Sequence, residues 1–184
     1  MGRPKKFSRE GVLEKAIPVF WKKGFAGASV RDLELATGVN KSSLYTEFAD
    51  KEDLFLAALG HYLTHREGAE ILRAEPLGWN NIEVFLGEAP SRAADRLGCF
   101  SVNSMRELAI LPEPVARATR QGRQRIYDLL RPNVAAANPR MDVDAVCELV
   151  SVFFAGLCIE LNLAPVPGRT TANIANFMAM LRSI

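Results

Sequence analysis

The sequence predicts an all-α protein of about nine helices. Apolar residues recur three and four positions apart through most of the 184-residue chain, which is the spacing of one helix face. We find no segment in which apolar and polar residues alternate, as they do in a half-buried strand. Ser, Asn or Asp precedes several of the periodic segments, and Gly follows some of them, as at helix starts and stops.

The first four predicted helices have clear boundaries. They are expected over residues 8–24, 29–38, 40–48 and 50–66. Each begins at a residue whose side chain can accept a hydrogen bond from the first turn. These expected caps are Ser8, Ser29, Asn40 and Asp50. Asp32 follows Ser29 by three positions, as in a capping box, so the second helix has the strongest start signal.

The later helices are less sharply marked. They are expected near residues 82–86 and 99–109, and over residues 115–130, 142–163 and 171–184. The segment 142–163 differs from the others, because it is apolar on both sides and has no charge from Leu149 to Ile159. Such a helix must be covered on both sides, by a large core or by a second subunit, and 184 residues do not make a large core.

Charge and composition narrow the class of protein. The net charge is only +2, but every lysine lies in the first 51 residues: Lys5, Lys6, Lys15, Lys22, Lys23, Lys41 and Lys51. We see no apolar run long enough for a membrane span and no signal peptide, and the three cysteines form no pattern, so we expect a soluble cytoplasmic protein. No cofactor motif, metal-ligand cluster or catalytic constellation is visible, which argues against an enzyme.

Residues 29–48 have the pattern of a helix-turn-helix. Gly38 accommodates the turn, and Ala36 is small where we expect the two helices to cross. The following helix starts with Lys41, Ser42 and Ser43. Short polar side chains at the start of a protruding helix allow it to approach base edges in the major groove of DNA.

The wider pattern resembles a known family. The string from Val30 to Leu54, with Tyr45, Phe48 and the run at 50–54, is similar to the DNA-binding head of TetR/AcrR-family transcriptional repressors. The block 16–24, with its aromatic pair before two lysines and a glycine, shares the resemblance.

The resemblance implies a homodimer that binds double-stranded DNA at a palindromic operator and is released by a small-molecule ligand. It divides the chain into a DNA-binding domain over residues 1–53 and a ligand-binding and dimerisation domain over residues 54–184. An activator or an architectural factor without a ligand is the alternative. The implied DNA contacts, including the basic tail, are Arg3, Lys5, Lys6, Ser29, Arg31, Lys41, Ser42, Ser43, Tyr45, Thr46 and Lys51.

Two further sets of residues are expected in the ligand-binding and dimerisation domain. The candidate ligand pocket, whose members also suit a plain core, comprises Trp79, Phe85, Phe100, Asn103, Met105, Tyr127, Phe153 and Phe154. The candidate dimer interface lies on the last two helices and comprises Val152, Ala155, Gly156, Ile159, Ile174, Phe177, Met178 and Leu181.

Three features have two interpretations each. The tail at residues 2–6 suits a minor-groove arm or a solvated terminus. His61 and His65 have the spacing of metal ligands but no visible third ligand, so ordinary histidines are favoured and no metal is expected. Cys99 is a candidate thiol sensor or, as we prefer, a small core residue.

Overall fold

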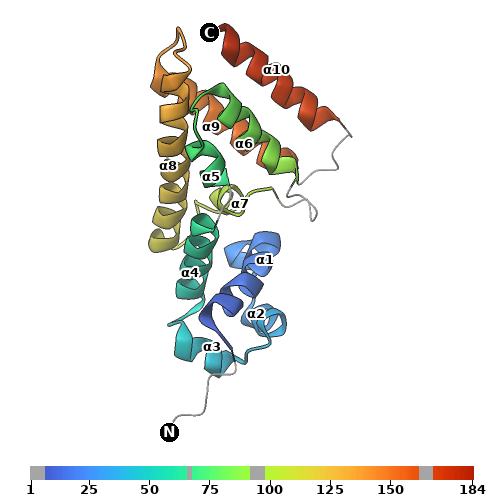
Figure 1. Cartoon of the computed structure of the whole chain (residues 1–184). Helices are drawn as coiled ribbons and strands as arrows, with labels where there is room; N and C mark the ends of the chain where they lie inside the picture. Colours follow the sequence, from blue (N-terminus) through green and yellow to red (C-terminus); the bar gives the residue numbers. More distant parts are fainter. Residues whose placement is uncertain (1–6, 66–67, 92–97, 162–167) are drawn as a thin grey trace. The chain divides into compact units, whose positions relative to one another are not determined.

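The computed structural model is built from helices joined by turns and short loops (Figure 1). It describes residues 7–65, 68–91, 98–161 and 168–184. This part of the chain forms ten helices and no strand, which confirms the predicted all-α class. Arg3, Lys5 and Lys6 of the basic tail lie outside the described residues.

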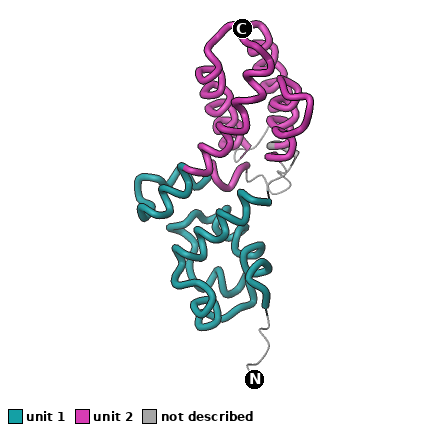
Figure 2. Tube along the Cα trace, turned by 60° about the vertical axis from the view of Figure 1, so that its left-hand side comes forward, with its two compact units in different colours: residues 1–65, 103–120 teal, residues 66–102, 121–184 magenta. Residues whose placement is uncertain are grey.

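The chain folds into two compact units (Figure 2). The first contains residues 1–65 and 103–120, and the second contains residues 66–102 and 121–184. The segment that follows residue 102 therefore belongs with the N-terminal helices, although it is distant from them in sequence. The division of function predicted at residue 53 stays a prediction.

The first unit contains the four helices with the clearest sequence signals. They are α1 (Arg9–Gly27), α2 (Val30–Thr37), α3 (Lys41–Glu47) and α4 (Lys51–Thr64). All four expected caps are confirmed, because each side chain accepts a backbone hydrogen bond from the first turn: Ser8, Ser29, Asn40 and Asp50. Local side-chain chemistry thus sets where these helices begin.

Aromatic side chains fill the core between α1 and α4. The ring of Phe55 meets Phe20 edge to face at 5.0 Å and Phe25 at 5.3 Å between centroids. Leu33 of α2 and Leu44 of α3 are also buried. The two short helices are therefore held on the unit by their apolar sides, and their other faces point away from the core.

One expectation about the turn between α2 and α3 was wrong. Ala36 is exposed, and its neighbour Thr37 is buried instead. The Thr37 hydroxyl donates to the carbonyl of Leu33 at 2.7 Å and accepts from the N–H of Val39 at 3.2 Å. Burial of this polar side chain leaves no unpaired group, because the backbone supplies both partners.

The second unit is built around α6. Its helices are α5 (Gly68–Arg73), α6 (Trp79–Ser91), α9 (Val143–Glu160) and α10 (Arg169–Ser183), while α7 (Phe100–Met105) and α8 (Glu113–Ala136) contribute to both units. α6 packs against α5, α9 and α10, and its side chains Ile82, Phe85 and Leu86 are fully buried.

Element boundaries in this half differ from the expected ones. α5 was not predicted, α7 is shorter because the chain continues in turns over residues 106–110, and α8 extends beyond residue 130. Among the described residues, no helix is long and apolar enough to cross a membrane.

The predicted dimer interface needs a correction. Ile174, Met178 and Leu181 are buried within the protomer, on the helix that packs against α6, so they have no free surface for a partner. α9 does present an exposed apolar face, which we call the α9 stripe. It consists of Leu149, Val152, Gly156 and Ile159, and Val152 is 64% exposed.

Candidate nucleic-acid interface

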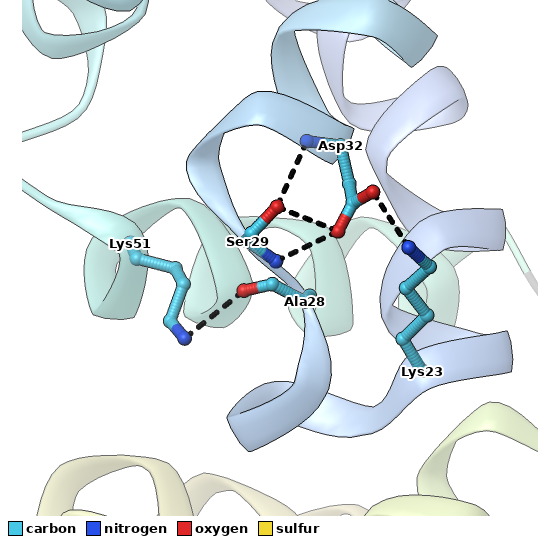
Figure 3. Close-up of polar contacts among 5 residues, drawn as sticks. All are labelled: Lys23, Ala28, Ser29, Asp32 and Lys51. Carbon is cyan, nitrogen blue, oxygen red and sulfur yellow. Dashed lines mark hydrogen bonds and ion pairs between the residues drawn. The ribbon is translucent and has the colours of Figure 1, made fainter.

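The start of α2 is fixed by a closed set of polar contacts (Figure 3). The Ser29 hydroxyl accepts from the N–H of Asp32 at 3.2 Å, and the N–H of Ser29 donates to the Asp32 carboxylate at 3.0 Å. The second carboxylate oxygen lies 2.6 Å from the ammonium of Lys23 on α1. The Lys23 ammonium and the two Ser29 donors hold the pKa of Asp32 well below its ordinary value of 3.8.

The start of α3 is held twice. The Asn40 side chain accepts from the N–H of Ser43 at 2.9 Å, and the Glu34 carboxylate accepts from the N–H of Lys41 at 2.5 Å. Gly38, with φ +72°, forms the turn between the two helices. α2 and α3 are therefore joined by a tight turn and by a charged hydrogen bond, so α3 follows the orientation of α2.

α3 presents a polar surface on the side away from Leu44. Lys41, Ser42 and Thr46 are exposed, and Tyr45 is half-buried with the Lys41 ammonium 5.9 Å from its ring centroid. Positions 41, 42, 45 and 46 are neighbours on one helix face. The structure thus brings together four of the predicted DNA contacts as one surface, which we call the α3 polar face.

The other described DNA-contact candidates lie on α2, at its cap and on α3 itself. Arg31 is exposed on α2, Ser43 is half-buried, and the Ser29 hydroxyl donates to Asp32 at 2.7 Å. Ser29 is exposed at the cap of α2, so both its cap role and a contact to a phosphate remain open to it.

Lys51 has internal partners that the sequence did not reveal. Its ammonium donates to the carbonyl of Phe25 at 2.9 Å and to that of Ala28 at 3.1 Å, and it lies 4.5 Å from the centroid of the Phe25 ring. Figure 3 shows the contact with Ala28. An ammonium has three protons, and two are used here. The phosphate contact expected of Lys51 stays a prediction.

Arg9 is a structural residue that sequence reasoning missed. Its guanidinium donates to the backbone carbonyl of Glu47 at 3.0 Å and to the Glu47 carboxylate at 3.2 Å, and it lies 4.3 Å from the Phe48 ring centroid. These contacts fix the end of α3 to the start of α1. The 38 positions between Arg9 and Glu47 leave no local sequence signal for such a pair.

Comparison with known proteins identifies the family. A model described as bacterial regulatory proteins of the tetR family matches residues 12–58. The HTH-type transcriptional repressor ComR of Escherichia coli is 47% identical over 62 residues, which cover 34% of this chain and 30% of ComR. The HTH-type transcriptional repressor AcnR of Corynebacterium glutamicum is 34% identical over 144 residues, which cover 74% of this chain and 71% of AcnR. This chain belongs to the tetR family.

A solved structure extends the similarity to the whole chain. It contains a cysteine mutant of the TetR family transcriptional regulator CifR in complex with 26-bp double-strand operator DNA. This tetR-family chain is 27% identical to it with a TM-score of 0.87, and the alignment covers 98% of this chain and 100% of that one. The ComR match, by contrast, spans less than a third of ComR. Membership of a family of regulatory proteins supports the prediction that the chain is not an enzyme.

Contacts of several candidate pocket residues are defined in this family member. Phe85 and Phe154 meet with ring centroids 4.8 Å apart, whereas Phe153 stacks on Phe177 of α10 at 3.8 Å. Tyr127 donates to the carbonyl of Asp144 at 3.4 Å. The remaining candidates are buried or half-buried: Trp79, Phe100, Asn103 and Met105. A ligand pocket therefore stays a prediction.

His61, His65 and Cys99 are the remaining candidate site residues. The rings of His61 and His65 are 4.2 Å apart, but within the described ranges no group of three His, Cys, Asp or Glu residues could hold a metal. Cys99 is buried, as expected of a core residue, and so are the other two cysteines. Burial raises the pKa of Cys147 to about 11, so this thiol is neutral at neutral pH.

Proposed function

We propose that this chain is a homodimeric transcriptional repressor that binds a palindromic operator through the α3 polar face and is released by a small-molecule ligand. The α3 polar face is the observation that carries the proposal. Lys41, Ser42 and Thr46 are exposed on a capped helix whose opposite side is anchored by Leu44, so a major groove can be approached without unfolding the head.

Side-chain chemistry separates the phosphate contacts of the head from its base contacts. Arg31 and Lys41 carry the charge that contacts phosphates, which fixes the register of the head on the duplex. Ser42 and Thr46 are short and polar, and they are the residues that contact base edges. Related proteins support this proposal, because ComR and AcnR are named as repressors and CifR is seen with operator DNA.

The α9 stripe supports the proposed homodimer. Four apolar or small residues lie along one side of α9, while Cys147, Phe154 and Cys158 on the other side are buried in the second unit. An exposed apolar face of this length is covered when two copies pack around a two-fold axis. A dimer then carries two heads, which bind half-sites one DNA turn apart, about 34–36 Å. A cytoplasmic location is part of this proposal, because a bacterial repressor works where the DNA is.

The proposal is tested by selecting DNA from a random pool with the full chain. We expect a palindrome with half-site centres about 10 bp apart, bound by two chains. A panel of small molecules is then screened for release of the selected DNA. Failure to enrich any sequence would refute operator binding, whereas enrichment without release by any compound would favour the activator or architectural alternative.

A further inference from the structure

A carboxylate from the segment after α7 is bound to the end of α1. Glu107 accepts hydrogen bonds from the N–H of Phe25 at 2.6 Å and from the N–H of Ala26 at 3.2 Å. Both partners belong to the first compact unit, although about eighty positions separate them in the sequence. The contact is therefore a tertiary one, made between the first helix and a segment that follows more than half of the chain.

The backbone of α1 is shaped to receive this carboxylate. Gly24 has φ +72° and ψ 175°, which interrupts the helical dihedral angles. An interrupted helix leaves N–H groups that need a partner, and a carboxylate is a strong one. A Cβ on Gly24 would lie 2.6 Å from both carboxylate oxygens of Glu107, so glycine supplies both the backbone conformation and the space.

The same turn is held from its other side by a positive charge. The Lys51 ammonium binds the carbonyl groups of Phe25 and Ala28, while Glu107 binds N–H groups of Phe25 and Ala26. Residues 24–28 are thus fixed between two side chains of opposite charge. The next residue is Ser29, the cap of α2, and α2 in turn holds the first N–H of α3 through Glu34.

We infer that Glu107 is a positioning residue for operator binding, because it holds the turn from which α2 and α3 are oriented. This inference rests on the proposed function. Glu107 acts through the α1–α2 turn and makes no DNA contact of its own. It also follows Asn103 and Met105, two of the candidate pocket residues, by only four and two positions.

The test measures binding to the selected operator as a function of salt. Removing a negative charge from a DNA-binding protein favours binding if only long-range electrostatics matters. The positioning role predicts the opposite. We expect Glu107→Ala to weaken operator binding by about tenfold, the loss that corresponds to roughly one charge-assisted hydrogen bond, with an unchanged salt slope because no phosphate contact is lost.

Glu113→Ala is the matched control. It removes a carboxylate from the same unit, and the partners of Glu113 are exposed arginines, with Arg120 at 2.8 Å. We expect operator binding to be unchanged or slightly tighter. Glu107→Gln keeps one acceptor oxygen of nearly the same shape, and it should fall between wild type and Glu107→Ala.

Amide-resolved hydrogen exchange measures the contact of Glu107 with α1 independently of operator binding. Exchange at Phe25 and Ala26 should become faster in Glu107→Ala and only partly faster in Glu107→Gln, and it reports on the contact whether or not DNA is present. Faster exchange with wild-type operator affinity would overturn the inference, as would tighter binding by Glu107→Ala. A wild-type chain that enriches no DNA would instead be a failure of the proposed function. If Glu107→Ala does not fold, operator affinity and amide exchange are both measured on Glu107→Gln.

Discussion

Asp32 joins α1 to the start of α2 through one carboxylate. One oxygen faces Lys23 on α1, and the other accepts from the backbone and the hydroxyl of Ser29. These contacts favour the charged form and lower its pKa from 3.8. Because the unfolded chain binds this proton more readily, the contribution of Asp32 to stability is full above about pH 4 and is lost as the pH falls through the lower folded-state pKa.

Replacing Asp32 should therefore change the pH dependence of stability. We expect Asp32→Asn to unfold at lower urea concentration than wild type at neutral pH, because the ion pair and the charged cap are lost. The difference in the free energy of unfolding should shrink steadily below about pH 4, because the unfolded wild-type chain binds the Asp32 proton there while the folded protein does so only at lower pH. Urea unfolding between pH 7 and pH 2 measures this. A difference that stays constant across the range would contradict the assignment, and Glu14→Gln, an exposed carboxylate on α1, is the control.

Lys41 should contribute one phosphate contact in each half-site. We expect Lys41→Ala to weaken binding to all DNA sequences and to reduce the slope of log K against log salt by about 0.9 for each half-site bound, since one released counterion is lost. Lys22→Ala is the control. Lys22 lines a groove between α1 and α2, and its substitution should leave the salt slope unchanged. Equal salt slopes for Lys41→Ala and wild type would show that Lys41 does not contact a phosphate.

Residues whose partners are close in sequence were predictable, and those with distant partners were not. The cap at Ser29 and its Asp32 partner are three positions apart, so their contact follows from the pattern. The family resemblance implies a DNA contact for Lys51, whereas its internal acceptors lie 23 and 26 positions away and no sequence pattern marks them. Glu107 escaped notice for the same reason.

At the scale of elements, helix starts were more predictable than helix ends and crossings. A side-chain cap is a local feature, whereas the end of α7 and the length of α8 depend on tertiary packing. α2 shows the limit of periodicity, because in eight residues the pattern did not distinguish Ala36 from Thr37 as the buried position. The apolar segment in α9 was expected to be covered on both sides; within the protomer one side is buried and the other, the α9 stripe, is exposed, so its cover by a second subunit stays a prediction.

The α9 stripe predicts how the oligomeric state should respond to a charge. We expect Val152→Glu to produce monomers in size-exclusion chromatography with light scattering, because an unpaired carboxylate would be buried at the centre of the interface. The fold should be retained, since Val152 is 64% exposed in the protomer.

Leu35→Glu is the matched control for this substitution. Leu35 on α2 is 75% exposed and lies far from α9 in sequence, so the same type of exchange there should leave the dimer intact. A dimer that persists in Val152→Glu would move the interface away from the α9 stripe.

At the scale of the whole molecule, the chain does not divide into two consecutive pieces. Residues 103–120 join the N-terminal helices, so the first compact unit contains both the α3 polar face and Glu107. The family resemblance implied a single boundary at residue 53. No sequence pattern shows that residues 103–120 pack with the N-terminal helices, because this packing depends on contacts made only in the folded chain.

The central claim is that the α3 polar face reads a palindromic operator, and Ser42 tests it most directly. The measurement is the affinity of Ser42→Ala for a panel of single-base variants of the selected operator, with non-specific DNA as the reference. Because a homodimer presents Ser42 twice, we expect preference to relax at one position in each half-site, symmetrically, while non-specific affinity stays unchanged. A uniform loss of affinity across the panel, or an unchanged preference at every position, would contradict the claim.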